Sequence, residues 1–255
     1  SEINKVIPTT LGIVADCKKV LEALVTEHQS HATYKAWVDH CLDNKSKHPF
    51  KYKEANDTFC RPQEAIEYIG KITNGEAIVT TDVGQHQMWS AQFYPFKHHS
   101  QWVTSGGLGT MGFGIPSAIG AQLAAPDKTV VCFVGDGGFQ MTNQEMALLP
   151  EYHLNVKIVL INNGTLGMVK QWQDKFFNQR FSHSVFNDQP DFIKMAEAYG
   201  VKSFLIDHPN KLKAQLDEAF NYEGPALIEV RISPTEPVNP MIPSGKANHE
   251  MEGLE

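Results

Sequence analysis

The stretch VVCFVGDGGFQMTNQEMALLPEYHLNVKIVLINN, residues 130–163, decides the fold of this chain. It contains two short apolar runs, VVCFV and KIVLI, which lead into Gly135-Asp136-Gly137-Gly138 and Asn162-Asn163 respectively. Continuous apolar runs are typical of strands buried on both faces, as in a parallel sheet. A helix-length segment, residues 143–152, lies between them. The stretch therefore predicts a strand–helix–strand unit with two adjacent parallel strands.

Asp136 and Asn163 follow the two predicted strands directly. The carboxyl ends of parallel strands open on one edge of the sheet, where ligands of open α/β sheets bind, so we expect these two side chains to be neighbours. Carboxylate and amide oxygens suit Mg²⁺ or Ca²⁺, and Mg²⁺ usually also holds phosphate groups. Gly137 and Gly138 would let the backbone approach a phosphate at a helix start. The alternative is that both polar groups are ordinary turns.

Strands and helices alternate along the chain from Arg61 onward. We expect further helices at residues 62–71, 85–94, 191–199 and 211–222, strands at 77–81, 201–206 and 225–232, and a glycine-rich turn followed by a helix within 106–125. Before Arg61 we expect a short helix at 16–25 and another over about 31–44. The alternation predicts an α/β fold, a doubly wound and mostly parallel sheet with helices on both faces.

Composition and charge exclude several classes of function. A net charge of −7, with no run of Lys or Arg, excludes the electrostatic footprint of a nucleic-acid-binding protein. No apolar run approaches the roughly 18 residues that would predict a membrane span. The four cysteines show no metal-binding spacing, and His28, His31, His40 and His48 show none either. Reduced cysteines favour a cytoplasmic location, with a plastid or mitochondrial one left open.

The spacing of the two polar groups resembles a known motif. GDG at 135–137, then 24 residues (138 to 161), then NN is similar to the thiamine diphosphate motif. The resemblance implies that Asp136, Asn163 and the backbone carbonyl of Thr165 hold Mg²⁺, which in turn holds the diphosphate of the cofactor.

Four further segments resemble one branch of that family, the large catalytic subunit of acetohydroxyacid synthase (acetolactate synthase). They are TDVGQHQMW at 81–89, SGGLGTMGFG at 105–114, LGMVKQW at 166–172 and PMIPSG at 240–245. The resemblance implies a Mg²⁺-dependent enzyme of branched-chain amino acid biosynthesis that decarboxylates pyruvate and condenses the product with pyruvate or 2-oxobutyrate. The alternatives are a pyruvate oxidase, a glyoxylate carboligase, a catabolic acetolactate synthase or a non-catalytic cofactor-binding module.

The resemblance also implies roles for individual residues. The cofactor-binding set comprises Val83, Gly84, Gln85, His86, Gly109, Met111, Asp136, Gly137, Gly138, Asn163, Thr165, Leu166, Gly167 and Met168. Met111 would support the bent cofactor. Trp172, together with Met168 and Val169, would select the second 2-ketoacid. Met111 and Trp172 are therefore the candidate catalytic residues. From the residues alone, His86 could be a helix-surface residue, Met111 core filling, and Val169 and Trp172 a buried helix face.

The resemblance finally bears on domains and partners. It implies that residues 1–28 are the tail of a preceding central domain, 29–60 a linker with a helix, and 61–255 the cofactor-binding domain; a disordered N-terminal arm is the alternative. The family's activating glutamate lies on an N-terminal domain of a partner subunit in a homodimer or tetramer. FAD would bind mostly outside these residues, and a regulatory small subunit is possible. We therefore expect these 255 residues alone to be inactive.

Overall fold

The computed structural model describes residues 2–28, 33–53 and 58–253. The chain forms two compact units, residues 1–49 and 50–255. The first unit contains helix α1 (Cys17–Glu27), which begins where the Asp16 carboxylate accepts a hydrogen bond from the Lys19 amide, and helix α2 (Lys35–Lys47). Both were expected within a few residues; the expected start of the second, at residue 31, lies outside the described residues.

The second unit is built on a parallel sheet, which has six strands within the described residues, in the order β2-β1-β3-β4-β6-β5. The strands are β1 (Ile78–Thr81), β2 (Trp102–Thr104), β3 (Val130–Gly135), β4 (Val156–Asn162), β5 (Lys202–Ile206) and β6 (Ala226–Arg231). The apolar runs of the opening stretch form the adjacent strands β3 and β4, in which every residue is buried. The doubly wound parallel sheet predicted from the sequence is confirmed.

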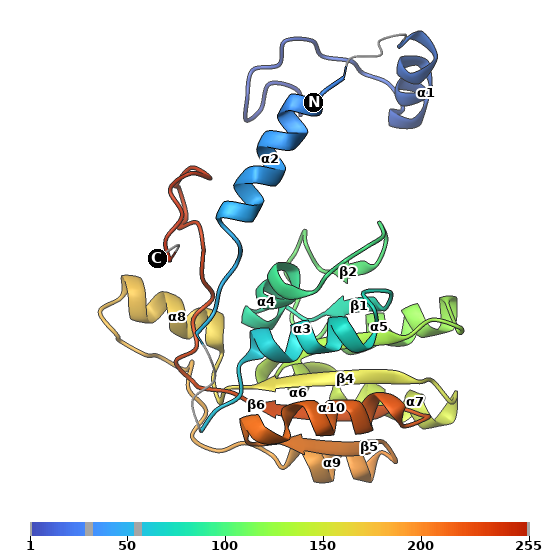
Figure 1. Ribbon diagram of the computed structural model, residues 1–255, viewed down its shortest axis with the longest axis vertical. Coiled ribbons are helices and arrows are strands. Elements are labelled where there is room, and N and C mark those ends of the chain that lie inside the picture. Colours follow the sequence, from blue (N-terminus) through green and yellow to red (C-terminus); the bar gives the residue numbers. More distant parts are fainter. Residues whose placement is uncertain (1, 29–32, 54–57, 254–255) are drawn as a thin grey trace. The chain divides into compact units, whose positions relative to one another are not determined.

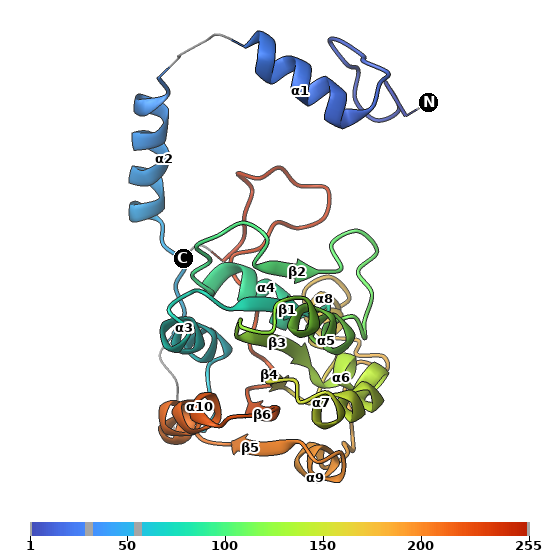
Figure 2. The same cartoon turned by 90° about the vertical axis from the view of Figure 1, so that its right-hand side faces the viewer.

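Helices cover both faces of this sheet. One face carries α3 (Pro62–Ile72), α4 (Gln85–Phe93) and α10 (Leu212–Asn221); the other carries α5 (Gly114–Ala124), α6 (Asp136–Thr142), α7 (Leu148–Glu151) and α9 (Phe192–Ala198). Figure 2 shows α3 and α10 on one side of the strands and α5, α6, α7 and α9 on the other. Side chains of β3 alternate between two cores, since Val131 and Phe133 join the first and Cys132 and Val134 the second.

The connection between β3 and β4 differs from the expectation of one helix at residues 143–152. Helix α6 begins at Asp136 itself, a 3₁₀ turn η1 follows at Asn143–Ala147, and α7 completes the crossover. The chain can enter a helix directly because Gly135 is still extended (φ −89°, ψ 162°) and two glycines follow Asp136 in the first turn. The Asp-Gly-Gly group is therefore a helix start and not a separate turn.

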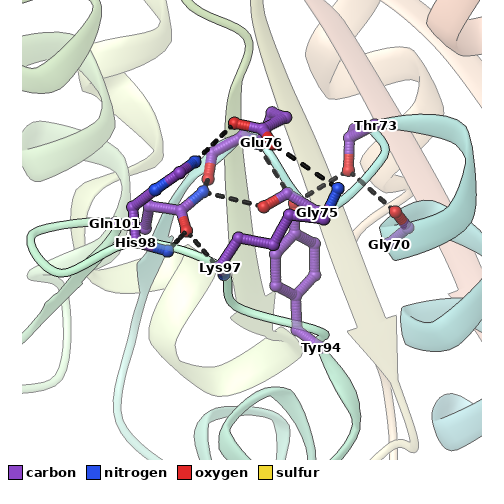
Figure 3. A network of polar contacts seen from close by, with 9 residues as sticks. Gly70, Thr73, Gly75, Glu76, Tyr94, Lys97, His98 and Gln101 are labelled. Atoms are coloured by element: carbon purple, nitrogen blue, oxygen red, sulfur yellow. Dashed lines mark hydrogen bonds and ion pairs between the residues drawn. The ribbon is translucent and has the colours of Figure 1, made fainter.

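Strand β2 was not expected from the sequence, and a polar network explains why so short an edge strand forms (Figure 3). The buried Gln101 amide donates to the carbonyl oxygens of Gly75 (2.9 Å) and Ala77 (3.1 Å), and its oxygen accepts from the backbone amides of Lys97 (2.9 Å) and His98 (2.6 Å). The first two bonds join the loop before β2 to the turn before β1, and the other two hold the loop before β2 in shape. A local sequence pattern does not reveal such a long-range tie.

Candidate functional site

The carboxyl ends of β1, β3 and β4 meet around one narrow cavity, and α8 (Gly167–Phe176) lies beyond this edge of the sheet (Figure 1). The chain reverses its winding direction between β1 and β3, which is where open α/β sheets bind ligands. The expected site residues that line this cavity are Val83, Gly84, Gln85, His86, Met111, Asp136, Gly137, Gly138, Asn163, Thr165, Leu166, Gly167, Met168 and Val169. Gly109 and Trp172 do not line it.

Asp136 carries a buried carboxylate, only 2% exposed, which has no ion-pair partner within the described residues. Its Oδ1 accepts from the Gly137 amide (2.9 Å) and its Oδ2 from Gln189 Nε2 (2.7 Å). Burial raises the pKa of Asp136 to about 6, and these hydrogen bonds, with those from the Gly164 and Thr165 amides, offset only part of the rise. A buried carboxylate of this kind favours a cation beside it.

The turn after β4 presents oxygen atoms to the same cavity. The Asn163 Oδ1 accepts from the Thr165 amide (3.1 Å) and the Thr165 hydroxyl (3.0 Å). Residues 164–166 pair with 184–186 through Leu166 N–H to Ser184 O (2.8 Å) and Phe186 N–H to Gly164 O (3.0 Å). Asn162 ties the start of this turn to strand β6, because its side chain donates to the buried Glu229 carboxylate (2.9 Å). The turn is therefore fixed on both sides.

His86 lines the cavity from the first turn of α4 and is a buried residue, not a helix-surface one. Its Nε2 atom is buried and has no hydrogen-bond partner. Burial lowers the pKa of His86 to about 4, against the opposing effect of the Asp82 carboxylate. The imidazole is therefore neutral at pH 7 and holds an unused polar atom, which is rare in a folded protein unless a ligand satisfies it.

Glycines let the segments around the cavity pack closely against one another. A Cβ on Gly137 would lie 2.5 Å from Leu166 Cδ2, and a Cβ on Gly138 would lie 2.2 Å from Asp82 Oδ1. The helices α4 and α8 both begin at the cavity, with their free backbone amides at that end. No Lys or Arg lines the cavity among the described residues. The donor set thus fits an anionic group held through a cation bound to Asp136, together with helix starts.

Asp82 is a residue that the sequence reasoning missed. It is buried at the end of β1, and its Oδ2 accepts from the amides of Gly112 (2.8 Å) and Gly114 (2.9 Å). It thereby fixes the loop that brings Met111 to the cavity. Its position directly after a strand, before Val83 and Gly84, was the only signal in the sequence. Gln189 was missed as well, and it carries no comparable signal.

Trp172 lies one helical turn beyond Met168 on α8 and lines a second, apolar cavity of about 610 Å³. Met168 and Val169 line both cavities, so α8 is the wall between them. The Trp172 Nε1 atom is buried and has no hydrogen-bond partner. The indole contacts Phe176 edge-on, with 5.5 Å between ring centroids. The structure thus places Trp172 beside the first cavity and not in it.

The raised pKa of Asp136 predicts that a cation placed beside this carboxylate would compete with a proton. A cation displaces the proton, so Mg²⁺ affinity should be constant well above pH 6 and should fall about tenfold per pH unit below it. Calorimetric titration of Mg²⁺ with saturating thiamine diphosphate between pH 5 and 8 would measure this. An affinity that does not change between pH 5 and 7 would contradict it.

Fold and site together define a class: a doubly wound α/β domain whose switch point suits an anion held through a hard cation. Within the described residues, no cluster of three or more His, Cys, Asp or Glu could hold a metal ion. No described helix is long and apolar enough to cross a membrane.

Comparison with known proteins identifies the family. The family model "Thiamine pyrophosphate enzyme, C-terminal TPP binding domain" matches residues 82–230, so the chain belongs to the thiamine pyrophosphate (thiamine diphosphate) enzymes and contains their C-terminal cofactor-binding domain. The chain is 51% identical over 254 residues to "Acetolactate synthase large subunit" of Lactococcus lactis subsp. lactis (strain IL1403), and the match covers 100% of this chain and 44% of that protein.

Two other relatives carry similar names. The chain is 41% identical over 259 residues to "Acetolactate synthase 1, chloroplastic" of Nicotiana tabacum, covering 97% of this chain and 39% of that protein. It is 39% identical over 251 residues to "Acetolactate synthase isozyme 2 large subunit" of Escherichia coli (strain K12), covering 98% of this chain and 45% of that protein. The chain thus spans less than half the length of these relatives.

Proposed function

We propose that this chain is the cofactor-binding part of the catalytic subunit of an acetolactate synthase, which decarboxylates pyruvate and joins the product to a second 2-ketoacid. The observation that carries the proposal is the cavity itself, where the buried Asp136 carboxylate, the Asn163 amide and the unpartnered His86 Nε2 lie together in a chain of this family. The names of the relatives support the reaction.

We propose that Asp136, Asn163 and the Thr165 carbonyl hold Mg²⁺, and that the Mg²⁺ holds the cofactor diphosphate. Thiamine diphosphate supplies the carbanion chemistry when it is bound, and the protein positions it. The unpartnered His86 Nε2 would lie at the diphosphate end of the cofactor, and Gly137 and Gly138 would admit the group. Met111, fixed by the Asp82-bound loop, would support the cofactor's rings; Gly109, in the left-handed conformation (φ 65°), would shape this loop.

We propose that the apolar cavity of Met168, Val169 and Trp172 receives the second 2-ketoacid. An apolar pocket of this kind can prefer the ethyl group of 2-oxobutyrate over the methyl group of pyruvate by only about 1–3 kcal/mol per methylene. The expected products are 2-acetolactate and its homologue, and the pathway is branched-chain amino acid biosynthesis.

The remaining expectations concern assembly. We propose that residues 1–28 are the tail of a central domain and that 29–60 are a linker to the cofactor-binding domain at 61–255. We propose that the protein works as a homodimer or tetramer in which a partner subunit supplies an activating glutamate. FAD would bind mostly outside these residues. A small regulatory subunit would be a further partner. The cytoplasm is the proposed compartment.

The test is an assay of the complete gene product with thiamine diphosphate and Mg²⁺. We expect acetolactate from pyruvate alone and the homologous acid when 2-oxobutyrate is added. Formation of acetyl phosphate or hydrogen peroxide would indicate a pyruvate oxidase instead, and turnover of glyoxylate would indicate a glyoxylate carboligase. Cofactor binding without any of these products would leave a non-catalytic binding module and overturn the proposal.

A further inference from the structure

The buried amides of Gln85 and Gln171 join the proposed metal ligand Asn163 to the C-terminal segment of the chain. Gln85 Nε2 donates to Gln171 Oε1 (2.8 Å) and to the Glu236 carbonyl (3.1 Å), while Gln85 Oε1 accepts from Asn163 Nδ2 (3.1 Å). Gln85 and Gln171 are 5% and 7% exposed. Although Gln85 lines the cavity, both ends of its side chain are committed to protein groups.

Backbone groups fix the orientation of each amide in this series. Gln171 Oε1 accepts from the Val238 amide (2.9 Å) and its Nε2 donates to the Val238 carbonyl (3.2 Å), so the Gln171 amide cannot be reversed. Gln171 Oε1 and the Glu236 carbonyl, both acceptors, then fix the Nε2 of Gln85. Gln85 Oε1 therefore faces Asn163. Because this oxygen can only accept a hydrogen bond, the Asn163 Nδ2 atom has to point toward it, and Asn163 Oδ1 points toward Thr165.

This orientation matters for a cation because an asparagine can bind it only through oxygen. In the structure Asn163 Oδ1 accepts from both the amide and the hydroxyl of Thr165, so a bound cation has to take the place of one of these bonds. The bond from Nδ2 to Gln85 is on the opposite side of the amide and is not in competition with the cation. It therefore holds the amide in the metal-binding orientation in both states.

The geometry of α8 supports the same reading. A Cβ on Gly167 would lie 2.0 Å from Gln85 Oε1 and 2.6 Å from Asn163 Nδ2. The helix can begin this close to the amide pair only because its first residue is glycine. Gly167 is thus required by the Gln85–Asn163 contact and not by a special backbone angle.

We propose that Gln85 and Gln171 are positioning residues that set the orientation of the Asn163 amide for Mg²⁺, and that the side chain of Gln85 does not itself bind the cofactor. This inference rests on the proposed metal site. It assigns Gln85 a role different from the direct cofactor contact that the family resemblance implies, and it assigns Gln171 a role that the resemblance does not imply.

The test measures Mg²⁺ affinity by calorimetry in the complete gene product with saturating thiamine diphosphate. Gln171→Leu should weaken Mg²⁺ binding by at least about tenfold, the usual size of an effect from a residue that supports a metal ligand. Gln92→Leu is the matched control: Gln92, on α4, also donates to the C-terminal segment, at the Pro240 carbonyl (3.1 Å), but it does not bond to Gln85 or Asn163. Gln92→Leu should leave the affinity within about threefold.

A double-mutant cycle separates orientation from general loosening of the structure. In an Asn163→Asp background both terminal atoms are oxygens, so either one can face Mg²⁺. Gln171→Leu should then not weaken Mg²⁺ binding, because it also frees the Gln85 amide to turn its Nε2 toward the carboxylate. An equal loss in both backgrounds, or a loss from Gln92→Leu equal to that from Gln171→Leu, would overturn the proposal. Absence of Mg²⁺-dependent cofactor binding in the unmodified protein would instead overturn the proposed function.

Discussion

Replacing Asp136 by alanine should lower Mg²⁺-dependent affinity for thiamine diphosphate by at least about 100-fold. The carboxylate is the only charged side chain among the described residues that line the cavity, and no Lys or Arg there could hold a diphosphate in its absence. Loss of a charged metal ligand costs more than loss of a residue that supports one, for which 10–100-fold is typical. Calorimetric titration of the cofactor in the presence of Mg²⁺ measures the effect.

Asp191→Asn is the matched control for this experiment. Asp191 caps α9 by accepting from the Lys194 amide (3.0 Å), and asparagine keeps that function. Asp191 does not line the cavity with Asp136. The control should bind the cofactor with unchanged affinity. Equal affinities for Asp136→Ala and the unmodified protein would refute the role of Asp136 at the metal.

The Asp136 carboxylate, which should raise the affinity for the cofactor, should lower the folding stability of the metal-free protein at neutral pH. Its pKa is about 6 when folded, against an ordinary value of 3.8, so the folded state binds the proton more tightly. Its contribution to stability is thus greatest below pH 4, falls as the pH rises to 6, and remains a cost at pH 7. In the metal-free protein Asp136→Asn should remove a cost on the order of 3 kcal/mol. Thermal melts measure both effects: Asp136→Asn should raise the melting temperature without Mg²⁺ and should reduce the increase that Mg²⁺ produces.

The outline of the fold could be read from the sequence because β3 and β4 are apolar at every central position. Burial on both faces leaves few alternatives to a parallel sheet, and the polar residues after each strand must then share one edge. Asp136, Gly137, Gly138 and Asn163 were placed at the cavity on this reasoning. Strand β2 was missed, because its pairing depends on Gln101 contacting the turn at residues 75–77.

The orientation of side chains in the site could not be predicted in the same way. A sequence identifies Gln85 as a polar residue at a helix start, but it does not show that Gln171, Glu236 and Asn163 occupy its hydrogen bonds. Likewise, Gln189 reaches Asp136 from a loop of no regular structure. These contacts join segments far apart in the chain, and only the packing of the sheet, α4 and α8 brings them together.

The polypeptide of these 255 residues, expressed alone, should bind thiamine diphosphate and Mg²⁺ but form acetolactate at no more than about 1% of the rate of the complete gene product. Positioned acid–base groups typically contribute about 10²–10⁴-fold to a rate. Within the described residues Asp136 is the only carboxylate that lines the cavity, and its proposed role at the metal leaves none to activate the cofactor's ring.

Subunit complementation tests the cause of this inactivity. The complete gene product carrying Asp136→Ala retains any glutamate outside these residues but lacks the proposed metal ligand. The 255-residue polypeptide contains the metal ligand but not a glutamate outside these residues. If the glutamate comes from a partner subunit, mixed assemblies should regain activity that neither protein has alone. Acetolactate formation by the polypeptide alone, at a rate close to that of the complete product, would contradict the prediction, because these residues would then contain every group that catalysis requires.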